Sequence, residues 1–108
     1  MARWLTKVLR RVQDLALQRR LRLTAKASQE IAALGLDPED VRDALMKLKS
    51  ADLDGRKISH VTGEWLHIFK RHAGEELVYI KLILRGECVL VSFHQDEEDD
   101  ERNDEPGQ

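Results

Sequence analysis

The stretch ELVYIKLILRGECVLVSFH, residues 76–94, decides the fold that the sequence predicts. Apolar residues recur at every second position on both sides of Arg85-Gly86, which is typical of two strands joined by a tight turn. The stretch therefore predicts an antiparallel hairpin of strands Glu76–Leu84 and Glu87–His94. With a two-residue loop, one face of this hairpin is entirely apolar and should pack in the core. That face holds Val78, Ile80, Leu82, Leu84, Val89, Val91 and Phe93.

The opposite face of the same hairpin collects polar side chains. In this register Tyr79 pairs with Ser92, and Lys81 and His94 lie on the same surface. A one-residue slip of one strand would break the apolar layer, so the pattern resists such a slip. A phenol, an ammonium, a hydroxyl and an imidazole on one surface suit RNA cleavage without a metal ion. The alternative is a solvated strand face without chemistry, because exposed strands commonly carry these residues.

Metal-independent cleavage of RNA needs three things: a proton acceptor for the 2′-hydroxyl, a proton donor for the 5′-oxygen, and positive charge beside the phosphorane. His94 can serve as acid or base, because the unperturbed histidine pKa lies near working pH. Lys81 can stabilise the negative charge that develops. Tyr79 can hydrogen-bond a phosphate or stack on a base. These three residues are therefore the candidate catalytic residues of the hairpin.

The residues before the hairpin predict helices first and further strands afterwards. Thr24 is a candidate N-cap and Gly35 a candidate C-terminal stop for one helix. Asp37 followed by Pro38 is a strong start for the next helix. This order predicts an α+β fold with a mainly antiparallel sheet. The candidate elements are helices over residues 5–16, 24–34 and 37–48, an edge strand over 21–23, and strands over 57–61 and 64–70.

Charge is distributed unevenly along the chain. The net charge is -2, but the residues after Gln95, DEEDDERNDEPGQ, hold 8 of the 20 acids and 1 of the 18 bases. Residues 1–95 therefore carry 17 bases against 12 acids, and a basic body suits a polyanionic partner. We expect a single domain over residues 1–95 and a disordered acidic tail over residues 96–108.

Cysteine content and hydropathy argue against several classes of protein. The single cysteine, Cys88, allows no disulfide within the chain and suits a reducing cytoplasm. Four scattered histidines without a paired carboxylate do not indicate a metal site. No stretch approaches the roughly 18 apolar residues of a membrane span, and the N-terminus lacks the features of a signal peptide. We therefore expect a cytoplasmic protein with no metal, no cofactor and no membrane partner.

Several segments of the chain, taken in order, resemble the MqsR toxins, which are RelE-like mRNA interferases of type II toxin–antitoxin systems. The resemblance covers about residues 5–94, and the ordered set is more specific than any single motif. The segments are Ala33-Leu34-Gly35-Leu36-Asp37, the strand that contains Trp65, Val78-Tyr79-Ile80-Lys81-Leu82 and Val89-Leu90-Val91-Ser92-Phe93.

This resemblance implies both a fold and an activity. The implied fold is RelE/MqsR-like, with N-terminal helices packed on one face of a curved sheet. The implied activity is that of a metal-independent endoribonuclease that cleaves mRNA and inhibits translation and growth. A cognate antitoxin protein is the implied partner, and the resemblance leaves open whether the ribosome is a further one.

The resemblance also implies roles for individual residues. Tyr79 matches a catalytic tyrosine of the family. His94 stands where the family has a catalytic lysine, and either residue can donate a proton or a positive charge. A second family lysine aligns with Lys57 or Arg56, and the glutamine expected after the tryptophan is replaced by Leu66. Lys57 therefore joins the catalytic candidates. The candidate RNA-binding residues are Arg56, Ser92 and His67.

Two other functions are compatible with the sequence. A non-catalytic RNA- or protein-binding module, with the same fold and a decayed site, would explain why Leu66 replaces the expected glutamine. A DNA-binding regulator would use the helix pair around Gly35. The second of these helices begins with acids, which repel phosphate, and it lacks base-reading side chains.

Overall fold

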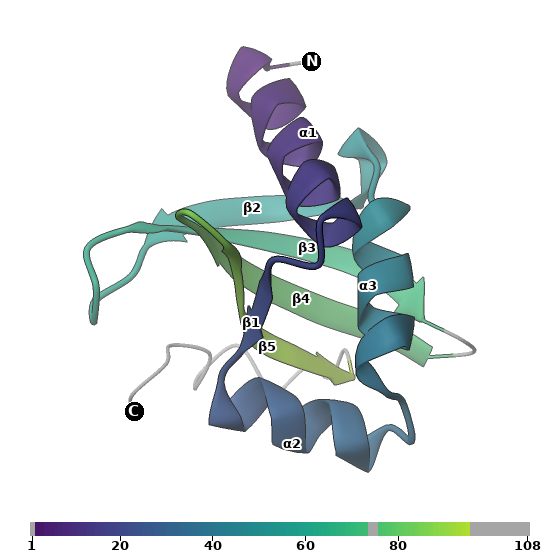
Figure 1. Ribbon diagram of the computed structural model, residues 1–108. Coiled ribbons are helices and arrows are strands. Elements are labelled where there is room, and N and C mark those ends of the chain that lie inside the picture. The colour runs from purple at the N-terminus through teal and green to yellow at the C-terminus, as the bar shows by residue number, and fades with distance from the viewer. Residues whose placement is uncertain (1, 74–75, 96–108) are drawn as a thin grey trace.

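The computed structural model describes residues 2–73 and 76–95, which form helices and a five-stranded sheet (Figure 1). The helices are α1 (Arg3–Leu17), α2 (Ala25–Ala33) and α3 (Pro38–Met46), followed by a short 3-10 turn, η1 (Ser50–Asp52). The strands are β1 (Leu21–Leu23), β2 (Leu53–Ile58), β3 (Trp65–Ala73), β4 (Glu76–Leu84) and β5 (Cys88–Gln95). The prediction of an α+β fold, with N-terminal helices before a mainly antiparallel sheet, is confirmed.

The strand order in the sheet is β1-β5-β4-β3-β2. Strands β2 to β5 form an antiparallel meander, whereas β1 runs parallel to β5. The predicted edge strand at Leu21–Leu23 is thus confirmed as β1, and it pairs with the last strand of the chain. Because α2 follows β1 directly, this pairing places α2 beside β5 (Figure 1).

Local signals in the sequence account for the helix ends. The Thr24 hydroxyl accepts a hydrogen bond from the Ala27 N–H at 3.1 Å, which caps α2. Gly35 has a φ of 73°, the left-handed conformation that favours glycine after a helix. Asp37 and Asp40 form a reciprocal capping box at the start of α3.

The core lies between one face of the sheet and the helices. We call the face that packs against α1 and α3 the helix side, and the opposite face the far side. On the helix side, Phe69, Ile80, Leu82 and Phe93 are fully buried. The helices contribute the buried residues Leu5, Val12, Leu15, Ala16, Ala27, Ile31, Val41 and Leu45.

The register of the hairpin differs from the one that the sequence predicts. Its loop has three residues rather than two, so Leu84 pairs with Cys88. A β-bulge follows, because Lys81 pairs with Ser92 while Leu82 pairs with Leu90, which leaves Val91 as the extra residue. The predicted pairing of Tyr79 with Ser92 is therefore wrong, and Tyr79 pairs with His94.

The composition of the predicted apolar face changes accordingly. Cys88 and Leu90 lie in the main core, whereas Val89 and Val91 pack in a second cluster with Leu66 and Ile83 on the far side. The prediction was wrong for the two valines, because every residue from Cys88 to Val91 is apolar and the alternation does not determine which ones face the helices.

Strand β2 begins earlier and ends earlier than the predicted strand over residues 57–61. It ends at Ile58 because Ser59 organises the turn that follows. The Ser59 hydroxyl accepts hydrogen bonds from the N–H groups of Val61 at 3.2 Å and Thr62 at 3.3 Å. A side chain that binds the backbone two and three residues ahead favours a turn over a continued strand.

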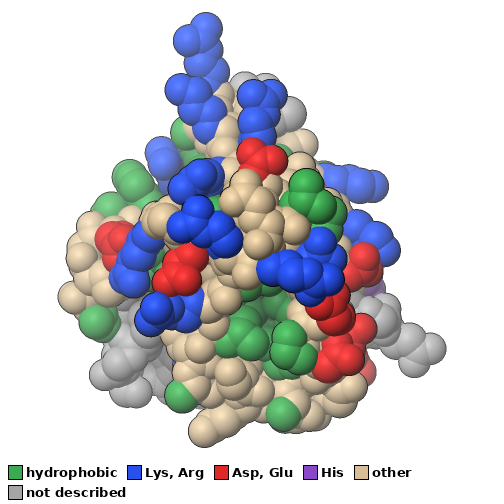
Figure 2. Space-filling view, in the orientation of Figure 1, with side chains coloured by type: hydrophobic (Ala, Val, Ile, Leu, Met, Phe, Trp, Pro, Cys, Tyr) green, Lys and Arg blue, Asp and Glu red, His purple; other side chains and the backbone are tan. Residues whose placement is uncertain are grey.

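The exposed basic residues of α1 lie on the helix side of the molecule. Figure 2 shows Lys and Arg side chains gathered over this part of the surface. Arg3, Lys7, Arg10 and Arg11 are all exposed. Among the described residues, no helix combines the length and the apolar content that crossing a bilayer requires.

Candidate functional site

Four of the predicted site residues come together on the far side of β4 and β5. Tyr79 lies opposite His94, with the ring centroids 5.7 Å apart, and Lys81 lies opposite Ser92. The Nζ atom of Lys81 is 5.5 Å from the centroid of the Tyr79 ring. Lys81 and Ser92 are buried, whereas Tyr79 and His94 are partly exposed. The structure thus gathers an imidazole, a phenol, an ammonium and a hydroxyl at one place.

Helix α2 adds a carboxylate and a second ammonium to this group. Glu30 Oε2 lies 3.1 Å from His94 Nδ1, and Glu30 Oε1 accepts hydrogen bonds of 3.0 Å from the Ser92 hydroxyl and the Phe93 N–H. Lys26 Nζ is 3.3 Å from Glu30 Oε2 and donates to the Ser92 hydroxyl at 3.1 Å. The Ser92 hydroxyl is also 2.6 Å from His94 Nδ1. We call Lys26, Glu30, Ser92 and His94 the α2–β5 network.

Thr24 fixes the position of α2 relative to this network. Its N–H donates to the Leu90 carbonyl and its hydroxyl donates to the Val91 carbonyl, at 3.1 and 3.0 Å. The same hydroxyl caps α2, so the beginning of the helix is attached to β5 beside the bulge. Lys26 and Glu30 are four residues apart and adjoin the buried stripe of Ala27 and Ile31, and they therefore face β5.

The α2–β5 network keeps Glu30 ionised. Burial is the largest single influence and favours the neutral acid, but the hydrogen bonds from His94 and the Phe93 N–H, with the charges of Lys26 and His94, outweigh it. Together they lower the pKa of Glu30 from 4.5 to about 2. The carboxylate is therefore a hydrogen-bond acceptor only, at any pH above about 4.

The lowered pKa of Glu30 predicts a specific loss of stability in acid. A carboxyl with a pKa lowered by folding stabilises the protein above its unfolded pKa, and this contribution disappears as the pH falls through the folded pKa. We therefore expect Glu30→Gln to reduce the free energy of unfolding by on the order of 1–3 kcal/mol at pH 6. The difference from wild type should shrink between pH 4.5 and 2.

Urea unfolding at several pH values measures this difference. The contributions of the other carboxyls to the pH dependence are common to both proteins and cancel. A difference that stays constant from pH 6 to pH 2 would contradict the assignment.

A second carboxylate–ammonium pair holds Tyr79 from the other side. The Tyr79 hydroxyl donates to Asp54 Oδ2 at 3.2 Å, and Lys70 Nζ lies 3.9 Å from Asp54 Oδ1 and 4.8 Å from the Tyr79 ring centroid. Asp54 reaches this position because it is the extra residue at the register shift between Leu53 and Gly55 in β2. Burial, with the charge of Asp54, raises the pKa of Tyr79 against the opposing effect of Lys70. Tyr79 is therefore a neutral phenol at physiological pH.

The structure does not bring Arg56 and His67 to this site. They pair with each other across β2 and β3, and His67 pairs with Leu82, a helix-side residue. The Arg56 guanidinium lies 3.9 Å over the Trp4 ring, on which His67 also stacks. His67 is only 5% exposed, and burial, with the charge of Arg56, lowers its pKa to about 4.

Lys57 lies on the far side, but not in the row of Tyr79. It pairs with Leu66, which packs with Ile83, Val89 and Val91 in the far-side apolar cluster. The register thus places Lys57 beside this apolar cluster, at the end of the sheet remote from the Tyr79–His94 pair.

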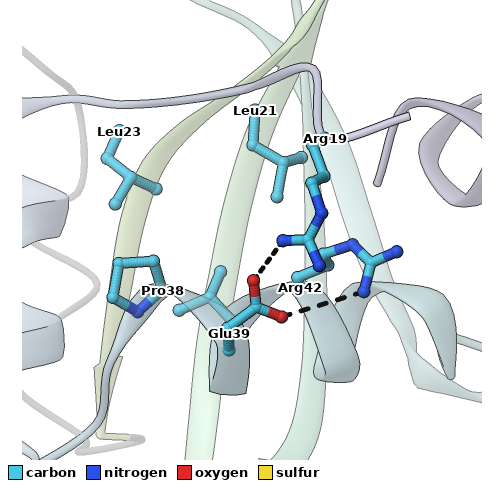
Figure 3. Close-up of a pocket in the computed structure, with 7 residues that line it drawn as sticks. Arg19, Leu21, Leu23, Pro38, Glu39 and Arg42 are labelled. Atoms are coloured by element: carbon cyan, nitrogen blue, oxygen red, sulfur yellow. Dashed lines mark hydrogen bonds and ion pairs between the residues drawn. The ribbon is translucent and has the colours of Figure 1, made fainter. Parts of the chain in front are cut away.

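A separate pocket of about 190 Å³ lies between β1 and α3 (Figure 3). Leu21, Leu23, Pro38 and Val41 form its apolar wall. Its charged groups bind one another, because Arg19 and Arg42 both reach Glu39. This pocket offers no histidine, hydroxyl or cysteine for chemistry, unlike the far side of β4 and β5, which is the candidate site. Within the described residues, no group of three or more His, Cys, Asp or Glu side chains could hold a metal ion.

A known protein family matches most of the chain. The family described as motility quorum-sensing regulator, toxin of MqsA, matches residues 6–95. The chain belongs to the MqsR toxin family. Membership makes the protein a toxin of a toxin–antitoxin system and implies an antitoxin partner. No curated protein sequence matches the chain. The resemblance inferred from the ordered segments is confirmed, whereas the roles of individual residues in this MqsR toxin stay predictions.

Four residues at the site of this MqsR toxin give no signal of their own in the sequence. They are Lys26, Glu30, Asp54 and Lys70. The spacing of Lys26 and Glu30 beside an apolar stripe indicates a pair on one helix face, but not the strand that the pair contacts. Asp54 reads as part of a turn signal, because it precedes Gly55.

Proposed function

We propose that this MqsR toxin is a metal-independent endoribonuclease that cuts mRNA in the cytoplasm and so inhibits translation and growth. The single observation that carries the proposal is the assembly of Tyr79, Lys81 and His94 on the far side of the sheet. These side chains supply a proton carrier, a cation and a neutral hydrogen-bond donor, and each of these can assist the reaction.

The proposed reaction is an internal transfer of the phosphate. The 2′-hydroxyl loses a proton and attacks the adjacent phosphorus, the bond from phosphorus to the 5′-oxygen breaks, and that oxygen gains a proton. The products are a 2′,3′-cyclic phosphate and a 5′-hydroxyl end. His94 carries one of the two protons, as acid or as base, and water carries the other. Lys81 stabilises the charge on the phosphorane. Tyr79 donates a hydrogen bond to a phosphate oxygen once its hydroxyl has released Asp54 Oδ2.

Ser92 has a different part in this proposal from direct RNA binding. Its side chain is fully buried, and its hydroxyl contacts Glu30, Lys26 and His94. These contacts occupy the hydroxyl within the α2–β5 network, and they favour a role in holding His94.

Cleavage of a defined mRNA by the purified protein tests the proposal. Incubation with excess chelator should yield fragments with 5′-hydroxyl and 2′,3′-cyclic phosphate ends, and induced expression in a bacterial host should stop growth. Co-expression of the antitoxin encoded with it should restore growth. A wild-type protein that is folded and harmless and leaves mRNA intact would contradict the proposal.

One observation favours a second function, that of a non-catalytic binding module. Leu66 is fully buried in the far-side apolar cluster, at the position where a polar residue is expected. A folded protein that binds RNA or an antitoxin without cleaving RNA in the same experiment would support this module.

A further inference from the structure

We propose that Glu30 is the positioning residue of His94, which holds the Nδ1 proton of the imidazole and leaves Nε2 as the reacting nitrogen. The proposal deepens the ribonuclease function and rests on it. It concerns a residue on α2 that has no place in the chemistry described above.

The hydrogen bonds of the α2–β5 network determine where the proton on His94 lies. Two oxygen atoms face Nδ1, namely Glu30 Oε2 at 3.1 Å and the Ser92 hydroxyl at 2.6 Å. An ionised carboxylate has no proton to donate. The Ser92 hydroxyl uses its one proton towards Glu30 Oε1, and it accepts from Lys26. Because an ionised carboxylate faces Nδ1 and the Ser92 proton is directed at Glu30, the geometry favours a proton on Nδ1.

The carboxylate cannot easily turn away from the imidazole. The Phe93 N–H holds Glu30 Oε1 at 3.0 Å, and Lys26 lies beside Oε2. The Thr24 contacts with Leu90 and Val91 hold the helix itself against β5. The Glu30 carboxylate, itself held by a backbone N–H, thus contacts His94 and fixes both the orientation and the tautomer of the ring.

This assignment defines the proton transfers at His94. Nε2 is shielded from solvent in this structure, so the transfers require RNA binding to uncover it. Neutral His94 then takes the 2′-hydroxyl proton at Nε2, or protonated His94 gives its Nε2 proton to the 5′-oxygen. Nδ1 keeps its proton throughout, and Glu30 stays ionised and stabilises the imidazolium. Glu30 touches neither the RNA nor the reacting atoms, so it acts only through His94.

Nitrogen NMR of the histidine rings tests the assignment without requiring any activity. In the ¹⁵N-labelled wild-type protein, neutral His94 should carry its proton on Nδ1, whereas free histidine prefers Nε2. In Glu30→Gln the population should move towards the Nε2-protonated form. Glu39→Gln is the matched control, since it removes a helix carboxylate that contacts Arg19 and Arg42 instead of His94, and it should leave the His94 signals unchanged.

Kinetics provide the second readout. Glu30→Gln should lower kcat about 10- to 100-fold, with little change in KM, because His94 then loses the group that fixes its orientation and tautomer. Glu30→Asp, which keeps the charge, should recover part of the loss. In a His94→Ala background, Glu30→Gln should have no further effect.

Two results would overturn the positioning role: a wild-type His94 protonated on Nε2, or a tautomer that Glu30→Gln does not alter. If Glu30→Gln fails to fold, the wild-type spectrum alone shows whether the His94 proton lies on Nδ1 or Nε2. If the spectra agree with the proposal but the wild type does not cleave RNA, the ribonuclease function fails while the assignment of the proton stands.

Discussion

Replacing His94 by alanine is expected to slow RNA cleavage by about 100- to 10,000-fold, the range that positioned proton transfer contributes. The change removes the imidazole that lies 5.7 Å from the Tyr79 ring. The fold should survive, because Glu30 keeps its hydrogen bonds from Ser92 and Phe93 and its ion pair with Lys26. Single-turnover cleavage of a defined RNA measures the rate, and circular dichroism checks the fold.

A second test variant and a control separate chemistry from folding. Tyr79→Phe keeps the ring and removes only the hydroxyl that contacts Asp54, so it should slow cleavage with little loss of stability. His60→Ala removes a histidine from the turn after β2 and should leave the rate near that of wild type. If the His94→Ala protein cleaves RNA and arrests growth as wild type does, His94 is not a catalytic residue.

Phe69→Ala is expected to lower the free energy of unfolding by about 3–5 kcal/mol. Phe69 is fully buried in the main core, where it pairs with Ile80 and Leu53 on the neighbouring strands. The truncation leaves a cavity that the close-packed neighbours cannot fill. This loss is a large part of the roughly 5–15 kcal/mol that typically separates folded from unfolded states.

Denaturant unfolding measures this effect as a shift of the midpoint at constant slope. Leu17→Ala is the control, because Leu17 is an apolar residue of α1 that is 59% exposed. It should change the free energy of unfolding by no more than about 0.5 kcal/mol. A loss below about 1 kcal/mol for Phe69→Ala would show that this part of the core is not closely packed.

Much of the fold was predictable because its signals are local. The Asp37 capping box, the Thr24 cap and the left-handed Gly35 each act within a few residues, and each determines a helix end. The alternation around Arg85 likewise predicts a hairpin, but not its loop length. Register depends on contrast between the two faces, and β5 has little contrast before Ser92.

The site was predictable only as far as a single hairpin extends. Tyr79 and His94 share a surface through strand alternation alone. Glu30 joins them because β1 pairs with β5 and so positions α2, and this contact spans more than sixty residues of sequence. No periodicity within α2 carries that information. Arg56 and His67 lie on the helix side, although their chemistry suits RNA, because His67 is opposite Leu82 and Arg56 is opposite His67.

The extra residue in the hairpin loop and the bulge at Val91 each shift the pairing of β4 with β5 by one residue. The loop changes the parity of the pairing, so that even-numbered residues of β4 face even-numbered residues of β5; the bulge changes the parity back before Ser92. Tyr79 and His94 lie opposite each other because the two one-residue shifts add up to two, which restores the alternation of faces. Either shift alone would pair Tyr79 with Phe93 and place the two rings on opposite surfaces. Relatives of this chain with a loop shorter by one residue are therefore expected to lack the bulge as well.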